Sequence, residues 1–358
     1  MNNLFRCDLD QLTRREFLKL SAAGLLGCLL AEYGSPLRLA SAEPVAELTL
    51  PCQGRVLEQA VNIHQWPDAR SNEISVLQRD ALVDIAQVTL AEESTQPNRV
   101  WYVLSGGEGY LNSSGIQPVE TRTNPVVRYI PKKGFPVEVT VPFTDTIWDY
   151  RLPDKKAYRL YYGAVVWVTA VALDTQNRLW YHLSDEWTSS VVYFGRPEHF
   201  HIFTTDDLAP LNPEVPAQHK RIEVRLKDQL MVAFEAERPV FMSRVSTGTA
   251  YGSQTFYTPP GLYYTNGKFP SRHMTHPDRL DPNAYDLPGV PWACYITSNG
   301  IAFHGTYWHN DFGRKRSHGC INLNLAAARW VYRWTTPSAP LQERIWLSNA
   351  ATRVDVLA

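Results

Sequence analysis

The sequence predicts a mainly β protein in which two small β-barrel repeats precede a larger β-sandwich or barrel domain. Short runs of alternating apolar and polar residues are separated by polar turns, and one seven-residue stretch recurs in the first part of the chain. In the last part of the chain, Leu325–Trp334 is the one segment with convincing helical character. With 358 residues, of which 44% are hydrophobic and 20% charged, the chain is long enough for two or three cores.

Residues 1–42 have the pattern of a twin-arginine export signal. Thr13–Lys19 contains paired arginines and leads into an uncharged stretch, and Ala40–Ala42 offers a small-x-small cleavage site. The uncharged stretch, Leu20–Ala31, is shorter than the roughly 20 residues of a transmembrane helix. We therefore expect export to the cell envelope, meaning the periplasm or the cell wall. Lipid anchoring at Cys28 and an ordinary amphipathic helix are the alternatives.

The middle of the chain contains an internal repeat. Asn98–Leu104 (NRVWYVL) recurs as Asn177–Leu183 (NRLWYHL), so one module is expected twice, at residues 50–120 and 137–207. Each copy has an alternating run, Ala81–Val88 and Val165–Ala172, which is typical of strands in a small barrel. The proline-rich segments 121–136 and 208–219 are predicted to be linkers.

Residues 219–358 are predicted to form the last and largest domain. Its long polar segment Thr265–Pro291 is expected to be a flap, because structureless stretches of this length are usually functional or disordered. That segment holds His273, Met274, His276 and Tyr285. Trp292–Phe303 has the pattern of two strand ends flanking a Ser-Asn-Gly turn. Helix Leu325–Trp334 follows, and Arg353–Leu357 is expected to return to the sheet as the last strand.

One cluster of residues has the composition of a nucleophilic site. Ser317-His318-Gly319-Cys320 is followed by Ile321-Asn322 and preceded, across a loop, by His304-Gly305. A thiol with a pKa of about 8.5 is only a few per cent ionised at neutral pH, so it needs a neighbouring base or cation. His304 and His318 could supply it, since lowering the pKa of the thiol to about 7 takes roughly 2 kcal/mol. These residues predict acyl transfer through a thioester.

The expected geometry of this cluster follows from strand alternation. If Ser317–Leu323 is extended, His318 and Cys320 project from the same face. Gly319 leaves the backbone open to a substrate, so the amides near Gly319 and Cys320 could bind an oxyanion, each contributing about 3 kcal/mol. Ser317 and Asn322 are candidates for hydrogen bonds to the substrate.

Other interpretations of the cluster give different chemistry. An isolated cysteine is often an inert small hydrophobe. Zinc is another alternative, because His304, His309, His318 and Cys320 are all ligand types, although no paired Cys-x-x-Cys or His-x-x-x-His spacing occurs there. A papain-like protease places its cysteine before its histidine, whereas here the order is reversed.

At these residues the chain resembles the L,D-transpeptidase (YkuD-type) family of bacterial cell-wall enzymes. That family's signature is His-Gly or His-Ser, a loop, then Ser/Thr-His-Gly-Cys and an apolar residue with Asn or Arg. Ser246-Thr247-Gly248 and Thr258-Pro259-Pro260-Gly261 match weaker family features. The resemblance spans about residues 220–358 and implies an L,D-transpeptidase-type β-sandwich or barrel there.

The resemblance implies a role for each matching residue. Cys320 would be the nucleophile, His304 the base that takes its proton, and His318 a residue that orients and polarises the site. Gly305 stands where some members have a serine, so it can offer only its backbone. Trp308 resembles an aromatic wall of the donor site.

The implied function is peptidoglycan cross-linking. The enzyme would cleave the bond after the diamino acid of a donor stem peptide, release D-alanine and pass the acyl group to an amine of an acceptor stem. With water as acceptor the same residues would give an L,D-carboxypeptidase, and with a protein amine they would attach an envelope protein to the wall. A non-catalytic wall-binding protein and a zinc-dependent hydrolase are the alternatives from other classes.

The expected partners follow from the same comparison and from composition. The two repeats resemble bacterial Src-homology-3-like domains, the second copy less closely, and such modules could hold glycan or wall polymer or simply position the enzyme. A formal net charge of −1 argues against nucleic acid as a partner. No cofactor or metal is expected, and we expect a monomer.

The cysteine count also yields an expectation. Removal of the signal takes Cys7 and Cys28 and leaves Cys52, Cys294 and Cys320, an odd number that indicates one free thiol in an exported chain. Cys320 is the candidate, with a disulfide between Cys52 and Cys294 as an open alternative.

Overall fold

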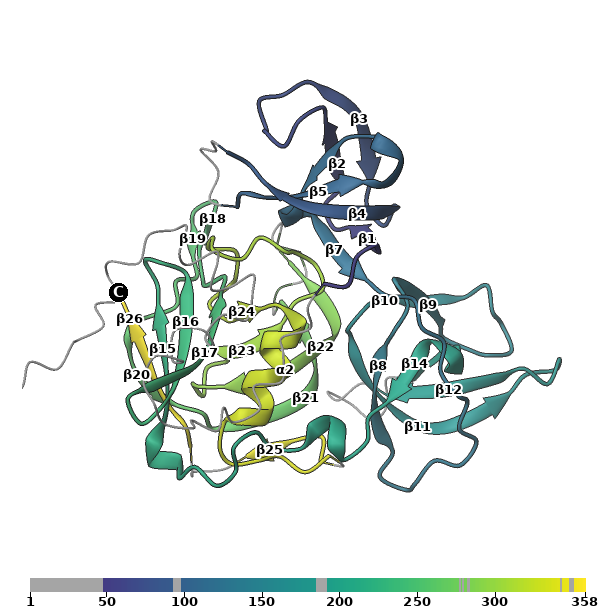
Figure 1. Cartoon of the computed structure of the whole chain (residues 1–358). Helices are drawn as coiled ribbons and strands as arrows, with labels where there is room; N and C mark the ends of the chain where they lie inside the picture. Colours follow the sequence, from purple (N-terminus) through teal and green to yellow (C-terminus); the bar gives the residue numbers. More distant parts are fainter. Residues whose placement is uncertain are drawn as a thin grey trace, which may run out of the picture. The chain divides into compact units, whose positions relative to one another are not determined.

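The computed structural model describes residues 48–92, 98–184, 192–276, 278, 280–281, 284–341, 343–347 and 351–358. The predicted export signal, with Cys7 and Cys28, lies outside these residues. Within the described part of the chain, no helix is both long and apolar enough to cross a membrane. The described residues are mainly β, as the sequence predicted (Figure 1).

Seven strands form the first sheet, in the order β3-β2-β6-β5-β4-β1-β7. They are β1 (Cys52–Val56), β2 (Ala60–His64), β3 (Glu73–Gln78), β4 (Leu82–Leu90), β5 (Val100–Leu104), β6 (Tyr110–Asn112) and β7 (Ile116–Val119). Seven further strands form the second sheet, in the order β10-β9-β13-β12-β11-β8-β14. They are β8 (Phe135–Val139), β9 (Phe143–Ile147), β10 (Lys156–Tyr161), β11 (Val165–Leu173), β12 (Leu179–Ser184), β13 (Val192–Gly195) and β14 (Phe200–Ile202).

The two sheets have the same topology. When the strands of each are counted from one to seven, both orders read 3-2-6-5-4-1-7. The recurring sequence stretches Asn98–Leu104 and Asn177–Leu183 contain the equivalent strands β5 and β12. The long strands beside them, β4 and β11, each have a register shift against that partner. The predicted repeat is therefore present as two copies of one strand arrangement.

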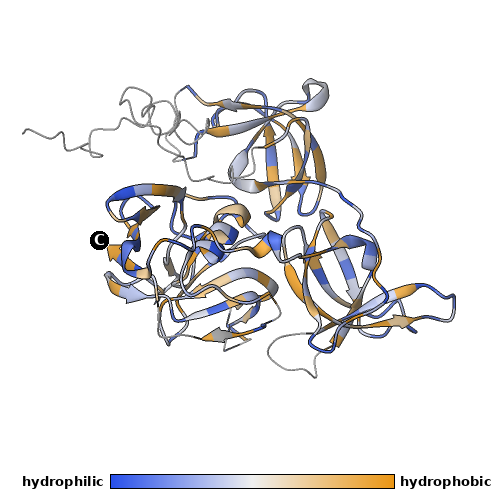
Figure 2. Ribbon diagram, turned by 60° about the horizontal axis from the view of Figure 1, so that its bottom comes forward, coloured by the Kyte–Doolittle hydropathy of each residue, from blue (hydrophilic) through white to orange (hydrophobic). Residues whose placement is uncertain are grey.

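Alternation along the strands builds a separate apolar core for each sheet, and apolar residues gather along the strands in Figure 2. The first core contains Val56, Ile85, Leu104, Leu111 and Ile116. The second contains Val137, Val139, Val166, Val168, Leu183 and Phe200, and also Tyr307, which comes from the C-terminal part of the chain. Short 3-10 turns connect strands at η3 (Ser105–Gly107), η4 (Ser113–Gly115), η5 (Pro197–His199), η6 (Asp206–Leu208) and η7 (Ala217–His219).

The C-terminal part contains two five-stranded sheets and one α-helix. The first sheet has the order β17-β16-β15-β26-β20, and the second β24-β23-β22-β21-β25. The strands are β15 (Lys220–Arg225), β16 (Leu230–Glu235), β17 (Arg238–Arg244), β20 (Gly261–Tyr264), β21 (Gly267–Thr275), β22 (Asp286–Tyr295), β23 (Ala302–Gly305), β24 (Ile321–Leu323), β25 (Trp346–Leu347) and β26 (Arg353–Leu357). A small hairpin pairs β18 (Ala250–Tyr251) with β19 (Gln254–Thr255).

Helix α2 (Leu325–Trp334) and the strand β26 have the bounds that the sequence predicted. The helix begins because Asn324 accepts a hydrogen bond from the Ala327 amide at 2.8 Å, which caps its first turn. Its inner face, with Ala327, Ala328 and Val331, shares one core with residues of both five-stranded sheets. The helix lies against β22 and β23 (Figure 1), directly after β24, so it holds the strands that carry the histidine and cysteine motif.

Two buried lysines close the far end of this helix. Lys268 Nζ donates to the carbonyls of Tyr332 and Thr335 at 2.7 and 2.6 Å. Lys220 Nζ donates to the Trp334 carbonyl at 3.1 Å. The last carbonyls of a helix have no partners within it and carry partial negative charge, so cations are favourable there.

Three expectations were wrong. Thr265–Pro291 is not a long flap loop, because most of it forms the paired strands β21 and β22. Ser317–Leu323 is not extended throughout: Gly319 has a φ of +113°, and β24 begins only at Ile321. Cys52 and Cys294 do not form a disulfide, and the described residues hold three free thiols rather than one. Cys52 lies in the first sheet and Cys294 in the core of the C-terminal part, so the fold separates them.

Candidate active site

Two parallel strands carry the histidine of the motif and the residues directly after its cysteine. β23 ends in His304 and Gly305, and β24 pairs with it so that His304 lies opposite Asn322. Cys320 comes directly before β24, at the entry to the strand that pairs with β23. Parallel neighbours need a crossover connection, and here the segment between the two strands provides it. The segment from Thr306 to Ser317 is therefore part of the site.

The turn before Cys320 is closed by the Ser317 hydroxyl. Ser317 Oγ donates to the Cys320 carbonyl and accepts the Gly319 amide at 3.1 Å. Gly319 has a positive φ, which glycine adopts without steric cost. The sequence suggested that Ser317 and the Gly319 amide bind substrate, but in this structure both groups are bonded within the turn. That role for them stays a prediction.

A second layer of residues supports the same turn. Thr258 Oγ1 donates to the Gly319 carbonyl at 2.8 Å and accepts the Gly248 amide at 3.0 Å. Gly248 allows this close approach, because a Cβ there would lie 1.9 Å from the Phe256 carbonyl oxygen. The motifs around Gly248 and Thr258, which looked like weak family features in the sequence, thus contact the cysteine turn directly.

Gln229 is a supporting residue that the sequence did not indicate. Its side chain bonds both the amide and the hydroxyl of Thr247, at 2.8 and 2.7 Å. Gln229 itself has a positive φ of 51° at the end of a turn. No local motif marks this glutamine, because its partner lies in a segment beyond the next two strands.

His304 is buried, with 2% of its surface exposed, and its tautomer follows from its partner. Nδ1 lies 3.0 Å from the Gly305 carbonyl oxygen, which can only accept, so Nδ1 carries the proton. The other ring nitrogen, Nε2, then has a free lone pair. Burial lowers the pKa of His304 to about 4, so the ring is neutral at pH 7 and can act as a base.

Cys320 is partly exposed, and its sulfur lies against the segment before β23. Sγ is 3.5 Å from the Gly300 carbonyl oxygen. Loss of solvation raises the pKa of the thiol to about 11, with the Ala302 backbone opposing this shift. This shift is opposite in direction to the one that would bring the thiol to half ionisation at pH 7. Both Cys320 and His304 are therefore neutral at pH 7 in this structure.

His318 sits in a group of aromatic rings. Its ring stacks on Tyr251, with centroids 4.4 Å apart, and lies 4.7 Å from Phe256 and 5.0 Å from Tyr285. Its Nε2 atom is buried and, among the described residues, has no hydrogen-bond partner. Its predicted role in orienting and polarising the site stays a prediction.

Asn322 faces a second buried histidine. Its side-chain amide lies 2.9 Å from Nε2 of His309, and Nδ1 of that ring is 3.4 Å from the Asp311 amide. Burial lowers the pKa of His309 to about 3. This bond joins the crossover segment to β24. A hydrogen bond from Asn322 to the substrate, as the sequence suggested, stays a prediction.

His304, His309, His318 and Cys320 are the residue types that made zinc an alternative in the sequence. Among the described residues, no group of three or more histidine, cysteine or acidic side chains is arranged to hold a metal ion.

The β21–β22 hairpin contributes to the site at its tip. Tyr285, directly before β22, contacts His318, and His276, directly after β21, has its ring 6.3 Å from the same residue. His273 lies elsewhere: it pairs with Asp286 and packs against Tyr158 of β10, with ring centroids 5.5 Å apart. The segment expected to be a flap thus contacts both the motif and the second sheet.

Trp308 lies beside the histidine, as an aromatic wall would. Its ring centroid is 5.7 Å from that of His304, and the side chain also packs against the core of the second sheet. Contact between Trp308 and a donor stem peptide stays a prediction. The neighbouring Tyr307 is buried within that core and donates from its hydroxyl to the Pro288 carbonyl at 2.7 Å.

The part of the chain that holds the cysteine turn and the buried histidine also matches a family model. Residues 219–354 match the family model of YkuD, the L,D-transpeptidase catalytic domain. The C-terminal part of this chain carries an L,D-transpeptidase domain. A Bacillus subtilis protein described as a candidate L,D-transpeptidase, YciB, is 24% identical over 133 residues, which are 34% of this chain and 63% of that protein. The chain therefore spans less than two thirds of that relative's length.

Two solved L,D-transpeptidase structures are similar to parts of the chain. The catalytic domain from Enterococcus faecium is 22% identical, with 38% of this chain and 96% of that chain covered and a TM-score of 0.30. The enzyme from Mycobacterium smegmatis is 16% identical, with 68% of this chain and 100% of that chain covered and a TM-score of 0.32.

Within the L,D-transpeptidase domain, the structure joins most of the residues that the sequence had singled out. His304 and Gly305 lie on the parallel strand pair, Cys320 comes directly before β24, and Ser317 and Gly319 form the turn that precedes it. The sequence marked Thr258 only as part of a weaker family feature, and it did not indicate the support from Gln229 and Tyr251. Their contacts depend on segments that are distant in sequence, so no local pattern could have revealed them.

Proposed function

We propose that this protein is a peptidoglycan L,D-transpeptidase that cross-links stem peptides through a thioester on Cys320. The observation that carries the proposal is the pairing of His304 Nδ1 with the Gly305 carbonyl, beside the turn that presents Cys320. This bond leaves Nε2 as the basic nitrogen, which is the state that a cysteine nucleophile requires of its partner. The family match of residues 219–354 supports the same chemistry.

The proposed acylation step uses this pair of neutral groups. Cys320 Sγ attacks the carbonyl carbon of the bond after the diamino acid, and the thiol proton passes to Nε2 of His304. The resulting imidazolium is held by its Nδ1–H bond to Gly305. When the tetrahedral intermediate collapses, the C–N bond breaks, the imidazolium returns the proton to the leaving amine, and D-alanine departs. The thioester remains on Cys320.

The oxyanion of this intermediate needs a donor. The Gly319 amide already donates a hydrogen bond to Ser317 Oγ. We therefore place the oxyanion at the Cys320 amide, which lies next to the sulfur. In the second half of the reaction, an amine of the acceptor stem attacks the thioester, His304 takes its proton, and the thiol re-forms. Water in place of the amine would release the trimmed stem as an L,D-carboxypeptidase product.

The rest of the chain fits an envelope enzyme. The twin-arginine pattern of residues 1–42 would export the protein to the periplasm or cell wall. The two seven-stranded sheets, which share one topology, would be Src-homology-3-like modules. We propose stem peptides as donor and acceptor, with glycan or wall polymer as a further partner of these modules.

Intact-protein mass spectrometry would test the reaction. The mature protein and its Cys320→Ala variant would be incubated with a disaccharide-tetrapeptide that has a diamino acid at its third position. We expect an acyl adduct on the wild type alone, with dimeric muropeptide in solution. Trimmed muropeptide without dimer would identify water as the acceptor. Folded wild-type protein that gives neither adduct nor product would overturn the proposal and favour a wall-binding role.

A further inference from the structure

A single buried arginine of the first sheet reaches the crossover segment of the catalytic domain. Arg55, on β1, is 2% exposed, and its guanidinium donates to the Tyr307 carbonyl at 2.6 Å. The same group donates to Gln117 Oε1 at 2.7 Å and to Asp80 Oδ1 at 3.0 Å. Arginine can bond several acceptors at once because its donors form a rigid planar fork.

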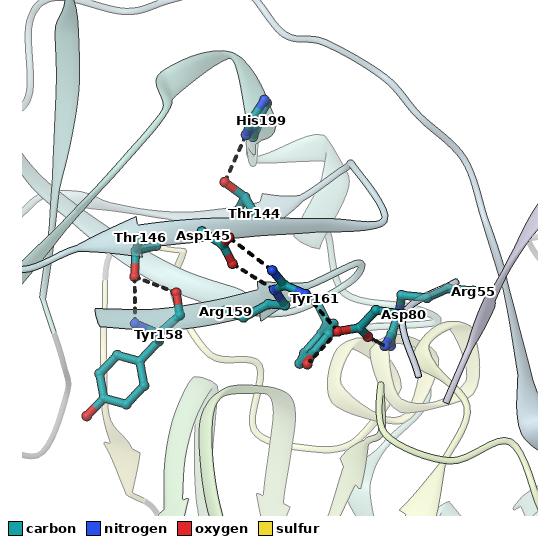
Figure 3. Close-up of polar contacts among 9 residues, drawn as sticks. All are labelled: Arg55, Asp80, Thr144, Asp145, Thr146, Tyr158, Arg159, Tyr161 and His199. Carbon is teal, nitrogen blue, oxygen red and sulfur yellow. Dashed lines mark hydrogen bonds and ion pairs between the residues drawn. The ribbon is translucent and has the colours of Figure 1, made fainter. Parts of the chain in front are cut away.

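The second sheet takes part in the same junction (Figure 3). The guanidinium of Arg55 lies 4.1 Å from the centre of the Tyr161 ring, and that ring stacks on Tyr307 with centroids 5.6 Å apart. Asp80 also pairs with Arg159 of β10 at 2.9 Å. Arg55 thus sits where side chains from both seven-stranded sheets meet the backbone of Tyr307.

The contacted segment leads directly to the reacting groups. Trp308, the next residue, packs beside His304, and His309 bonds Asn322 on β24. The segment has a second anchor on the first sheet, because Asn310 Nδ2 donates to the carbonyls of Ser113 and Ile116, each at 3.0 Å. The stretch from Tyr307 to Asn310 is therefore held from outside the catalytic domain at both ends.

We infer that Arg55 is a positioning residue, which fixes the Tyr307–Asn310 segment through the Tyr307 carbonyl and so places Trp308 beside His304. The inference rests on the proposed function for its effect on catalysis, although the placement of the segment can be measured without substrate. Small displacements in an active site cost rate, about 100-fold for 1 Å. The first sheet then has a structural role in the active site, in addition to any role in binding the wall.

The test compares three variants of the whole mature protein with the wild type. Arg55→Met removes every donor, whereas Arg55→Lys keeps the charge but cannot bond three acceptors in one plane. Arg151→Gln is the matched control, because Arg151 is exposed and pairs only locally, with Asp149 in its own turn.

Hydrogen exchange of peptides covering residues 306–311 is the readout that needs no substrate. The amides of Thr306 and Asn310 donate to Leu323 and Ser114 carbonyls at 3.0 and 3.2 Å. These amides should exchange at least about 10-fold faster in Arg55→Met than in the wild type. Their exchange rate should be intermediate in Arg55→Lys and equal to the wild-type rate in Arg151→Gln. Unchanged exchange in folded Arg55→Met would overturn the inference.

Kinetics with the disaccharide-tetrapeptide give the second readout. Because Arg55 is buried and acts through the Tyr307–Asn310 segment, Arg55→Met should lower kcat by about 10- to 100-fold and leave KM nearly unchanged. An equal kcat in the presence of faster exchange would also overturn the inference. An inactive wild type with the expected exchange pattern would reject the proposed reaction and leave the positioning role in place.

If Arg55→Met does not fold, Asn310→Ala replaces it. This change removes the other anchor of the segment without leaving a buried charge unpaired, and it should raise exchange over residues 306–311 in the same way. Exchange identical to the wild type in both Asn310→Ala and Arg55→Lys would then overturn the inference.

Discussion

At the residue scale, the Ser317 hydroxyl makes two of the bonds that shape the turn before Cys320. It is an acceptor for Gly319 and a donor to Cys320, and the residue is 5% exposed. A buried hydroxyl with both functions satisfied is expensive to delete, because the two backbone groups then lose their partners in a place with little water.

We expect Ser317→Ala to lower the free energy of unfolding by about 1–3 kcal/mol and to slow acylation of Cys320. The matched control is Ser243→Ala, since Ser243 Oγ bonds only the neighbouring Arg244 carbonyl in a half-buried strand. That change should cost less than about 1 kcal/mol. Urea unfolding and acylation rates of both variants check this, and equal losses in the two would contradict the role of the turn.

The protonation of Cys320 gives a second prediction at this scale. Burial raises the pKa of the thiol to about 11 and lowers that of His304 to about 4, so the thiolate fraction keeps growing as pH rises above neutrality. Alkylation by iodoacetamide should accelerate from pH 7 to 10 without a plateau. Peptide mapping would separate Cys320 from the half-buried Cys52. A plateau beginning below pH 7 would instead indicate a stable thiolate–imidazolium pair.

At the scale of elements, the parallel pair β23–β24 and helix α2 together hold the motif. The helix starts at its asparagine cap and ends where Lys268 binds the Tyr332 and Thr335 carbonyls. Lys268 is 2% exposed, so its charge has little access to water. Burial lowers its pKa to about 8, which makes the helix end sensitive to pH.

Whether stability rises or falls with pH follows from the protonation of Lys268 in the folded and the unfolded chain. Between pH 8 and about 10.5 the unfolded chain holds the Lys268 proton while the folded chain has released it, so raising pH through this window favours folding. Relative to Lys268→Met, the wild type should gain roughly 3 kcal/mol of unfolding free energy across the window. Urea unfolding of both proteins at several pH values measures the difference. A difference that stays flat would show that the lysine is not held as described.

At the scale of the whole molecule, Tyr307 connects parts of the chain that have their own cores. It belongs to the catalytic segment, yet its ring is buried in the core of the second sheet, and its hydroxyl reaches Pro288 on β22. Loss of this ring therefore removes packing that the second sheet and the catalytic domain share.

We expect Tyr307→Ala to destabilise the protein by about 3–5 kcal/mol. Tyr307→Phe keeps the ring and loses only the hydroxyl bond, so it should cost about 1 kcal/mol. Hydrogen exchange during partial unfolding should show strands β8, β11 and β22 losing protection together in Tyr307→Ala. Loss confined to the catalytic domain would contradict the shared core.

The sequence by itself determined the mainly β class, the repeat, helix Leu325–Trp334 and strand Arg353–Leu357, because these depend on local periodicity and on self-similarity. It also singled out Cys320 and His304, since a rare combination of residue types marks them. Only the tertiary structure decided that most of Thr265–Pro291 belongs to β21 and β22, that Gly305 accepts the proton of His304 Nδ1, and that Arg55 contacts Tyr307. These features depend on contacts between distant segments or on the solvation of buried groups, which local sequence patterns do not encode.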